Sequence, residues 1–181
     1  MGAPLEDDPE LAAALGRMVG AWSHLEYLWT LQFAKFTGMG LNMAAGVFDF
    51  FKSTRTQCDV LRRLGNISPR SSEEIREGLK ITLKLYQELA DRRNKLAHNP
   101  FGWMGGEGRE IYIMEKTKGT PGPNRIPYRR TPIKAEDLDN LRDDINVLVA
   151  AIVKIGLMSP PPLPAPSQVG LLPHTHPSPV P

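Results

Sequence analysis

The sequence predicts an all-α protein: a four-helix up-down bundle with a small β-hairpin inserted between the third and fourth helices and a disordered Pro-rich tail. Two observations indicate this fold class. Apolar residues recur at spacings of three and four over four long segments, which places them on one face of each helix. Residues that start and stop helices flank these segments. We expect one helical domain over residues 8–158 and a disordered tail over 159–181.

The first helix is expected to run from Asp8 to about Thr37. The Asp8 carboxylate can cap free backbone N–H groups, Pro9 suits the first helical position, and Gly38 suits the residue after the last turn. Its apolar face comprises Leu11, Leu15, Met18, Trp22, Leu25, Trp29 and Phe33.

The second helix is expected from about Asn42 to Leu64 as one continuous segment, with Gly65 and Asn66 as its stop. Its apolar residues are less regularly spaced than those of the first helix. They are Val47, Phe50, Phe51, Cys58, Leu61 and Leu64.

The third helix is expected to open at a capping box over residues 71–74 and to end near His98, because Pro100 steers Asn99 out of the helical region. An arginine, Arg93, shares the apolar lane of this helix. An unpaired guanidinium among packed neighbours is costly, so Arg93 needs a partner. Glu26 is the predicted partner, in a structural ion pair or a catalytic role. The lane comprises Leu79, Leu83, Tyr86, Ala90, Arg93 and Ala97.

The segment between the third and fourth helices is expected to form the hairpin. Residues 101–108 are predicted to be a glycine-rich turn. Residues 110–114 alternate like a strand and can pair with residues 125–130. A last helix is expected from about Ala135 to Leu157. Beyond Met158 the chain holds nine of the 17 prolines and no Lys, Arg, Asp or Glu, which predicts the disordered tail.

Composition favours a soluble, cytoplasmic protein without a membrane segment. Charged residues interrupt every apolar run, and the acidic start of the chain is unlike a secretory signal. A single cysteine, Cys58, fits a reducing compartment and a buried apolar role. Phosphate loops, dinucleotide-binding motifs and zinc-ligand spacings are missing from the sequence. We therefore expect no metal and no cofactor.

Charge is unevenly distributed along the chain. The net charge of the whole chain is only +2, yet residues 92–134 contain ten Lys and Arg against three Glu. Such a basic segment could attract phosphate groups as a flap that protrudes from the bundle. A solvated loop would look the same, and the sequence does not separate the two readings.

The chemistry of the third helix centres on Arg93 and His98. An arginine fork matches a phosphodiester and stabilises the extra negative charge of its transition state. An imidazole can take up and release protons near neutral pH, so it can activate a ribose 2′-OH without a metal. Five positions along a helix turn through about 500°, so the two side chains meet only if the helix unwinds at its end. Pro100 favours such unwinding.

The pattern Arg93-Asn94-x-x-x-His98, at the end of an inner helix of a bundle, resembles the HEPN superfamily (higher eukaryotes and prokaryotes nucleotide-binding), over about residues 10–157. The segment 22–26 and Ser53-x-Arg55 are also similar to a bacterial branch of it. The resemblance implies a homodimer whose two motifs line one cleft. It also implies metal-independent RNA cleavage by a toxin or antiviral effector, with an antitoxin protein as a partner.

On this resemblance Arg93 and His98 are the catalytic candidates, and Asn94 would orient the histidine or bind phosphate. The candidates for binding the RNA or nucleotide substrate are Arg55, Glu26, Arg92 and Lys95. Two other readings stay open. The basic residues could simply suit the negative end of a helix dipole. The bundle could also be a non-catalytic dimerisation or regulatory module that binds nucleotide, RNA or protein through the same cleft.

Overall fold

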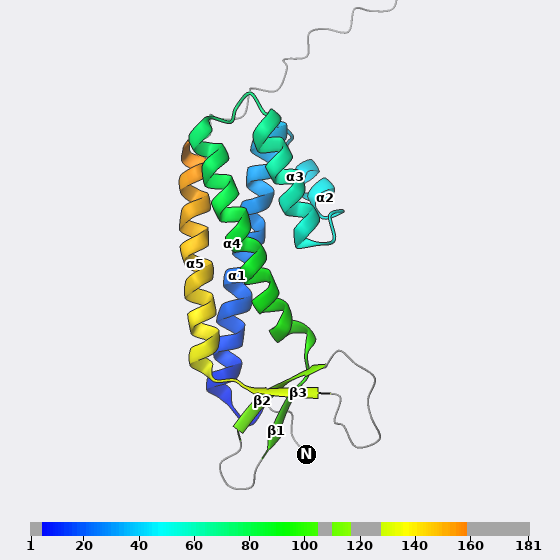
Figure 1. Ribbon diagram of the computed structural model, residues 1–181, viewed down its shortest axis with the longest axis vertical. Coiled ribbons are helices and arrows are strands. Elements are labelled where there is room, and N and C mark those ends of the chain that lie inside the picture. The colour runs from blue at the N-terminus through cyan, green and yellow to red at the C-terminus, as the bar shows by residue number, and fades with distance from the viewer. Residues whose placement is uncertain (1–4, 105–109, 117–127, 159–181) are drawn as a thin grey trace, which may run out of the picture.

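A computed structural model describes residues 5–104, 110–116 and 128–158. Its described part is mostly helical, with a small antiparallel sheet at one end (Figure 1). The tail predicted over 159–181 and several basic residues of the predicted flap, among them Arg109 and Arg125, lie outside the described residues. In the ranges that are described, no helix combines the length and the apolarity needed to cross a membrane.

Helix α1 (Pro9–Thr37) has the predicted bounds and caps. The Asp8 carboxylate accepts a hydrogen bond from the backbone N–H of Leu11 at 2.9 Å. Gly38 ends the helix with a φ of 75°, a left-handed conformation that glycine adopts without steric cost. Six of the seven predicted apolar residues are buried, and the seventh, Leu15, packs at the edge of the core.

The predicted second helix is two helices, α2 (Leu41–Phe48) and α3 (Thr54–Ile67). The break follows from Ser53, whose side chain accepts a hydrogen bond from the backbone N–H of Thr56 at 3.1 Å and thereby starts a new helix. Phe50, predicted to be apolar core, lies in the break and is 80% exposed. Gly65 is not a stop, because α3 continues through it to Ile67.

Helix α4 (Glu73–His98) and helix α5 (Ala135–Met158) confirm the predicted third and fourth helices. Ser72 caps α4 by accepting from the backbone N–H of Ile75. A hydrogen bond from Ser72 is the main reason that the pKa of Glu74 is lowered. Ser72 and Glu74 thus interact through their side chains. The reciprocal pairing of a capping box is not formed, because the residue three positions after the Ser72 cap is Ile75 and not a glutamate.

The helix directions differ from the predicted up-down order. Arg17 pairs with Asp139 near the starts of α1 and α5, and Lys35 donates to the Gly156 carbonyl near their ends, so α1 and α5 are parallel. Helix α4 runs antiparallel to both (Figure 1). The break after α2 explains the difference, because the chain turns back there and α3 starts in the direction of α1.

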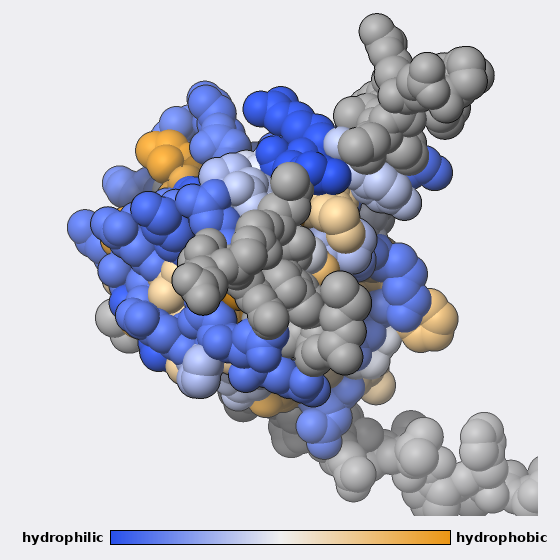
Figure 2. Space-filling model, turned by 90° about the horizontal axis from the view of Figure 1, so that it is seen from below, coloured by the Kyte–Doolittle hydropathy of each residue, from blue (hydrophilic) through white to orange (hydrophobic). Residues whose placement is uncertain are grey.

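The predicted hairpin is part of a three-stranded antiparallel sheet in the order β1-β2-β3. Strands β2 (Glu110–Lys116) and β3 (Tyr128–Pro132) pair, as predicted, with Met114 opposite Arg130. Strand β1 (Phe101–Met104) replaces the start of the predicted glycine-rich turn. Ile111 and Ile113 are buried, so β2 joins the core, while the described surface at the sheet end is largely hydrophilic (Figure 2).

Gly65 of α3 packs closely against the side chain of Leu79 on α4. A Cβ built there would lie 2.6 Å from Cδ1 of the buried Leu79. We expect Gly65→Ala to lower the free energy of unfolding by about 1–3 kcal/mol, because overpacking outweighs the gain in helix propensity. Gly20→Ala is the matched control, since Gly20 lies in α1 with open space around it, and it should be neutral or stabilising. Urea unfolding measures both, and equal effects would contradict the close approach.

Cys58 is buried between α3 and α4, and burial raises its pKa to about 11. The folded state therefore holds the thiol proton, and this contribution to stability is lost as the pH rises from the thiol's ordinary range toward 11. We expect iodoacetamide at pH 8 to label native protein at least about 100-fold more slowly than unfolded protein. Cys58→Ala should flatten the alkaline decline in stability. Equal labelling rates of the two states would show that the thiol is accessible.

Candidate functional site

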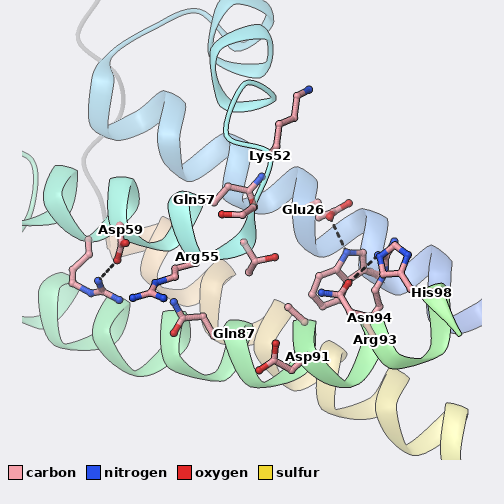
Figure 3. Close-up of a pocket in the computed structure, with 15 residues that line it drawn as sticks. Glu26, Lys52, Arg55, Gln57, Asp59, Gln87, Asp91, Arg93, Asn94 and His98 are labelled. Atoms are coloured by element: carbon pink, nitrogen blue, oxygen red, sulfur yellow. Dashed lines mark hydrogen bonds and ion pairs between the residues drawn. The ribbon is translucent and has the colours of Figure 1, made fainter. Parts of the chain in front are cut away.

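A cleft of about 890 Å³ opens between α1, α3 and α4 (Figure 3). Its lining is rich in charged and amide side chains. The cations are Lys52, Arg55, Arg62 and Arg93, the carboxylates are Glu26, Asp59 and Asp91, the amides are Gln57, Gln87 and Asn94, and His98 adds an imidazole. Such a mixture can bind a ligand that carries both negative charge and hydrogen-bonding edges.

Arg93 is half-buried at one end of the cleft. Its guanidinium carbon lies 5.7 Å from the centroid of the Trp22 ring, within the range of a cation–π interaction. One of its N–H groups donates to the Asn94 side-chain oxygen at 3.3 Å. Arg93 shares the apolar face of α4, yet its guanidinium contacts the Trp22 ring at the cleft and is not enclosed in the core.

The predicted Arg93–Glu26 ion pair does not form, although both residues are described and line the same cleft. Glu26 instead accepts a hydrogen bond from the indole N–H of Trp22 at 2.8 Å. The prediction was wrong about the partner because Trp22, one turn earlier on α1, lies between the two charges. The positive charge of Arg93 is instead stabilised by the cation–π contact with Trp22 and by its partial exposure in the cleft.

Trp22 is fixed from below by Tyr86. The two rings stack with centroids 5.4 Å apart and an interplanar angle of 23°. The Tyr86 hydroxyl donates to the Gln57 side chain at 3.1 Å, which connects the stack to α3. Burial, and then the nearby charge of Glu26, raises the pKa of Tyr86. Tyr86 therefore stays protonated and serves as a rigid support.

His98 is exposed and is the last residue of α4. Figure 3 shows its imidazole at the same end of the cleft as Arg93 and Asn94. The helix stays regular through His98, and the extended backbone begins at Asn99 with a φ of −105° and a ψ of 138°. The predicted unwinding before His98 therefore does not occur, and both side chains nevertheless line the same cleft.

Arg55 lies on the first turn of α3 and is exposed toward the other end of the cleft (Figure 3). Near it, Arg62 forms an ion pair with Asp59 at 2.6 Å. The cleft thus offers cationic side chains at both ends, with amides between them. This spacing suits a ligand with more than one anionic group.

Arg92 and Lys95 do not line this cleft. Arg92 forms an ion pair with Asp144 of α5, and Lys95 lies 3.9 Å from Glu115 of β2. Both residues point to the α5 and sheet side of α4, where they also line a smaller groove. The structure therefore does not bring them together with Arg93, because neighbouring positions on a helix differ by about 100° in direction.

The sequence carried a signal for two cleft residues that were not predicted, Gln87 and Asp91. Gln87, Asp91, Asn94 and His98 follow spacings of four, three and four, so they form one polar stripe on α4. This stripe runs beside the apolar lane that ends at Arg93. Lys52 and Arg62 had no comparable signal, since their place depends on the break between α2 and α3.

The described ranges contain no group of three or more His, Cys, Asp or Glu side chains placed to hold a metal ion. His24 is exposed on α1 and is not part of the cleft lining. Comparisons with family models, with curated proteins and with solved structures found no match to this chain.

Proposed function

We propose that the chain is a HEPN-like, metal-independent endoribonuclease that acts at the cleft between α1, α3 and α4. The observation that carries this proposal is the joint presence of Arg93, Asn94 and His98 at one end of an open polar cleft. A guanidinium can stabilise negative charge, an amide can orient groups, and an imidazole can transfer protons, and these are the functions that phosphodiester transfer within RNA needs.

The reaction would use the ribose 2′-oxygen as nucleophile. His98 would take the 2′-OH proton, the 2′-oxygen would bond to phosphorus, and the bond from phosphorus to the 5′-oxygen would break. The leaving 5′-oxygen would receive a proton from the protonated His98 of a second copy, which gives a 2′,3′-cyclic phosphate and a 5′-OH. Arg93 would stabilise the negative charge on the non-bridging oxygens, and Asn94 would orient the phosphate or the imidazole.

A homodimer fits this chemistry, since one step removes a proton and the other supplies one. The described lining of the cleft contains a single histidine, and its exposed position would let the histidine of a second copy approach the same phosphate. Within the cell, such an enzyme would act as a toxin or a phage-defence effector restrained by an antitoxin protein.

The test is cleavage of a labelled RNA by the pure protein in the presence of a chelator. We expect cleavage that EDTA leaves unchanged, products that end in a 2′,3′-cyclic phosphate, and no cleavage of DNA of the same sequence, which lacks the 2′-OH. Cleavage that requires an added divalent metal, or equal cleavage of DNA, would refute the proposed reaction.

The second candidate is a non-catalytic RNA- or nucleotide-binding module that uses the same cleft. The single histidine among the described lining residues favours it, because one imidazole per cleft suffices for binding but not for separate acid and base roles. Binding of RNA that depends on Arg55 and Arg93, without turnover at any enzyme concentration, would identify this function.

A further inference from the structure

Trp22 forms the floor of the cleft beneath Arg93 and is held from several sides. Its side chain is only 3% exposed, Tyr86 stacks against it, and its indole N–H donates to Glu26. The residue that faces Arg93 is therefore a fixed ring rather than a mobile one. The fixed ring therefore restricts the position of the Arg93 guanidinium that lies over it.

The chemistry of the contact favours a cation on the ring face. A carboxylate bonded to the indole N–H increases the electron density of the ring, which strengthens the attraction for a guanidinium. Glu26 thus strengthens the contact between Trp22 and Arg93 through its hydrogen bond to the indole, without forming an ion pair with Arg93. A direct ion pair would occupy the N–H donors with which an arginine binds phosphate.

The guanidinium carbon of Arg93 lies over the Trp22 ring, 5.7 Å from its centroid. The five N–H donors of the guanidinium lie along its edge, and within the described chain the one side-chain hydrogen bond from that edge goes to Asn94. Arg93 is half-buried and lines the cleft, so its other N–H donors are available to a phosphate there.

We propose that Trp22 and Glu26 are positioning residues for Arg93: they hold its guanidinium over the Trp22 ring and leave N–H donors for a phosphate of the substrate. The identity of the ligand rests on the proposed function. The positioning itself depends only on the contacts of these three residues, so it can be tested without turnover.

The kinetic arm compares Trp22→Phe with Trp29→Phe. Both variants remove an indole that packs on Tyr86, but only Trp22 lies beneath Arg93. We expect Trp22→Phe to lower kcat for RNA cleavage by about 3- to 10-fold with little change in KM, the range of a cation–π contact. Trp29→Phe should leave kcat unchanged at temperatures where both variants are folded.

A double-mutant cycle separates positioning from a general structural role. If Trp22 acts through Arg93, Trp22→Phe should cause no further loss of kcat in the Arg93→Ala background. An equal loss with and without Arg93 would overturn the proposal. Glu26 is exposed, so Glu26→Ala and Glu26→Gln serve as variants that leave the core intact. The glutamine keeps an acceptor for the indole N–H and should recover part of the rate.

The second arm follows the Arg93 Nε–H resonance by NMR in the full chain, assigned by its loss in Arg93→Lys. We expect it to move in Trp22→Phe and Glu26→Ala and to stay in place in Trp29→Phe. A resonance that is unchanged in all three would overturn the positioning. If the wild-type protein neither binds nor cleaves RNA, the proposed function fails. Titration with inorganic phosphate then decides the inference: a phosphate-dependent Arg93 shift that Glu26→Ala weakens supports it, and no shift overturns it.

Discussion

His98→Ala is expected to slow RNA cleavage by about 100- to 10,000-fold, the contribution of a general acid or base. The imidazole is the one histidine ring among the described lining residues, so no neighbouring side chain of that kind can replace it. RNA affinity should change little, because Arg55 and Arg93 remain. Initial rates with a fluorescent RNA and binding by anisotropy measure the two effects separately.

The loss should not come from unfolding. His98 is exposed at the last position of α4, and among the described residues none hydrogen-bonds its ring. The melting temperature should therefore stay within about 2 °C of the wild-type value, as is usual for an exposed substitution. His24→Ala is the matched control, since His24 is exposed on α1 outside the cleft. A His98→Ala protein that cleaves RNA at the wild-type rate would exclude the catalytic role.

Arg93→Ala is expected to lower kcat/KM by about 100- to 1,000-fold, because it removes a preorganised donor from the developing charge. Arg93→Lys should recover only a small part of this loss, since an ammonium keeps the charge but lacks the planar fork and stacks poorly on Trp22. The same cleavage assay measures both variants, and melting curves report the small loss of the contact with Trp22.

Arg92→Ala is the matched control for Arg93→Ala. The two arginines are adjacent in sequence, but Arg92 pairs with Asp144 on the far side of α4. A general effect of lost positive charge would lower the activity of both variants alike. Loss of a specific contact in the cleft would lower the cleavage activity of Arg93→Ala alone. Equal losses of activity in the two variants would contradict the assignment of the cleft as the active site.

The helices with strong local signals could be predicted from the sequence, and the break between α2 and α3 could not. Asp8, Gly38, Ser72 and Pro100 each act on the backbone within a few residues, so their effect is visible in the chain itself. Around Phe50, by contrast, the aromatic residues mimic a buried helix face. Whether they are buried depends on where the chain turns, which is a tertiary property.

Strand β1 was missed for a similar reason. Its hydrogen bonds run to β2, which lies several residues further along the chain, so the segment 101–104 has no local signal stronger than its glycine. The same limit applied to the cleft. Arg93, Asn94 and His98 were predicted because they share one short motif, whereas Lys52 and Arg62 reach the cleft only through the packing of α3 against α4.

The transition from α4 to β1 has a consequence for the order of His98. A helix normally frays at its last turn, yet the Pro100 carbonyl, two residues beyond the imidazole, accepts a hydrogen bond from the Met114 backbone N–H. The sheet thereby anchors the chain just past the last residue of α4. Slow hydrogen exchange at the Met114 backbone N–H would then report that the backbone next to His98 is held in place, and loosening of the sheet would free this end of α4.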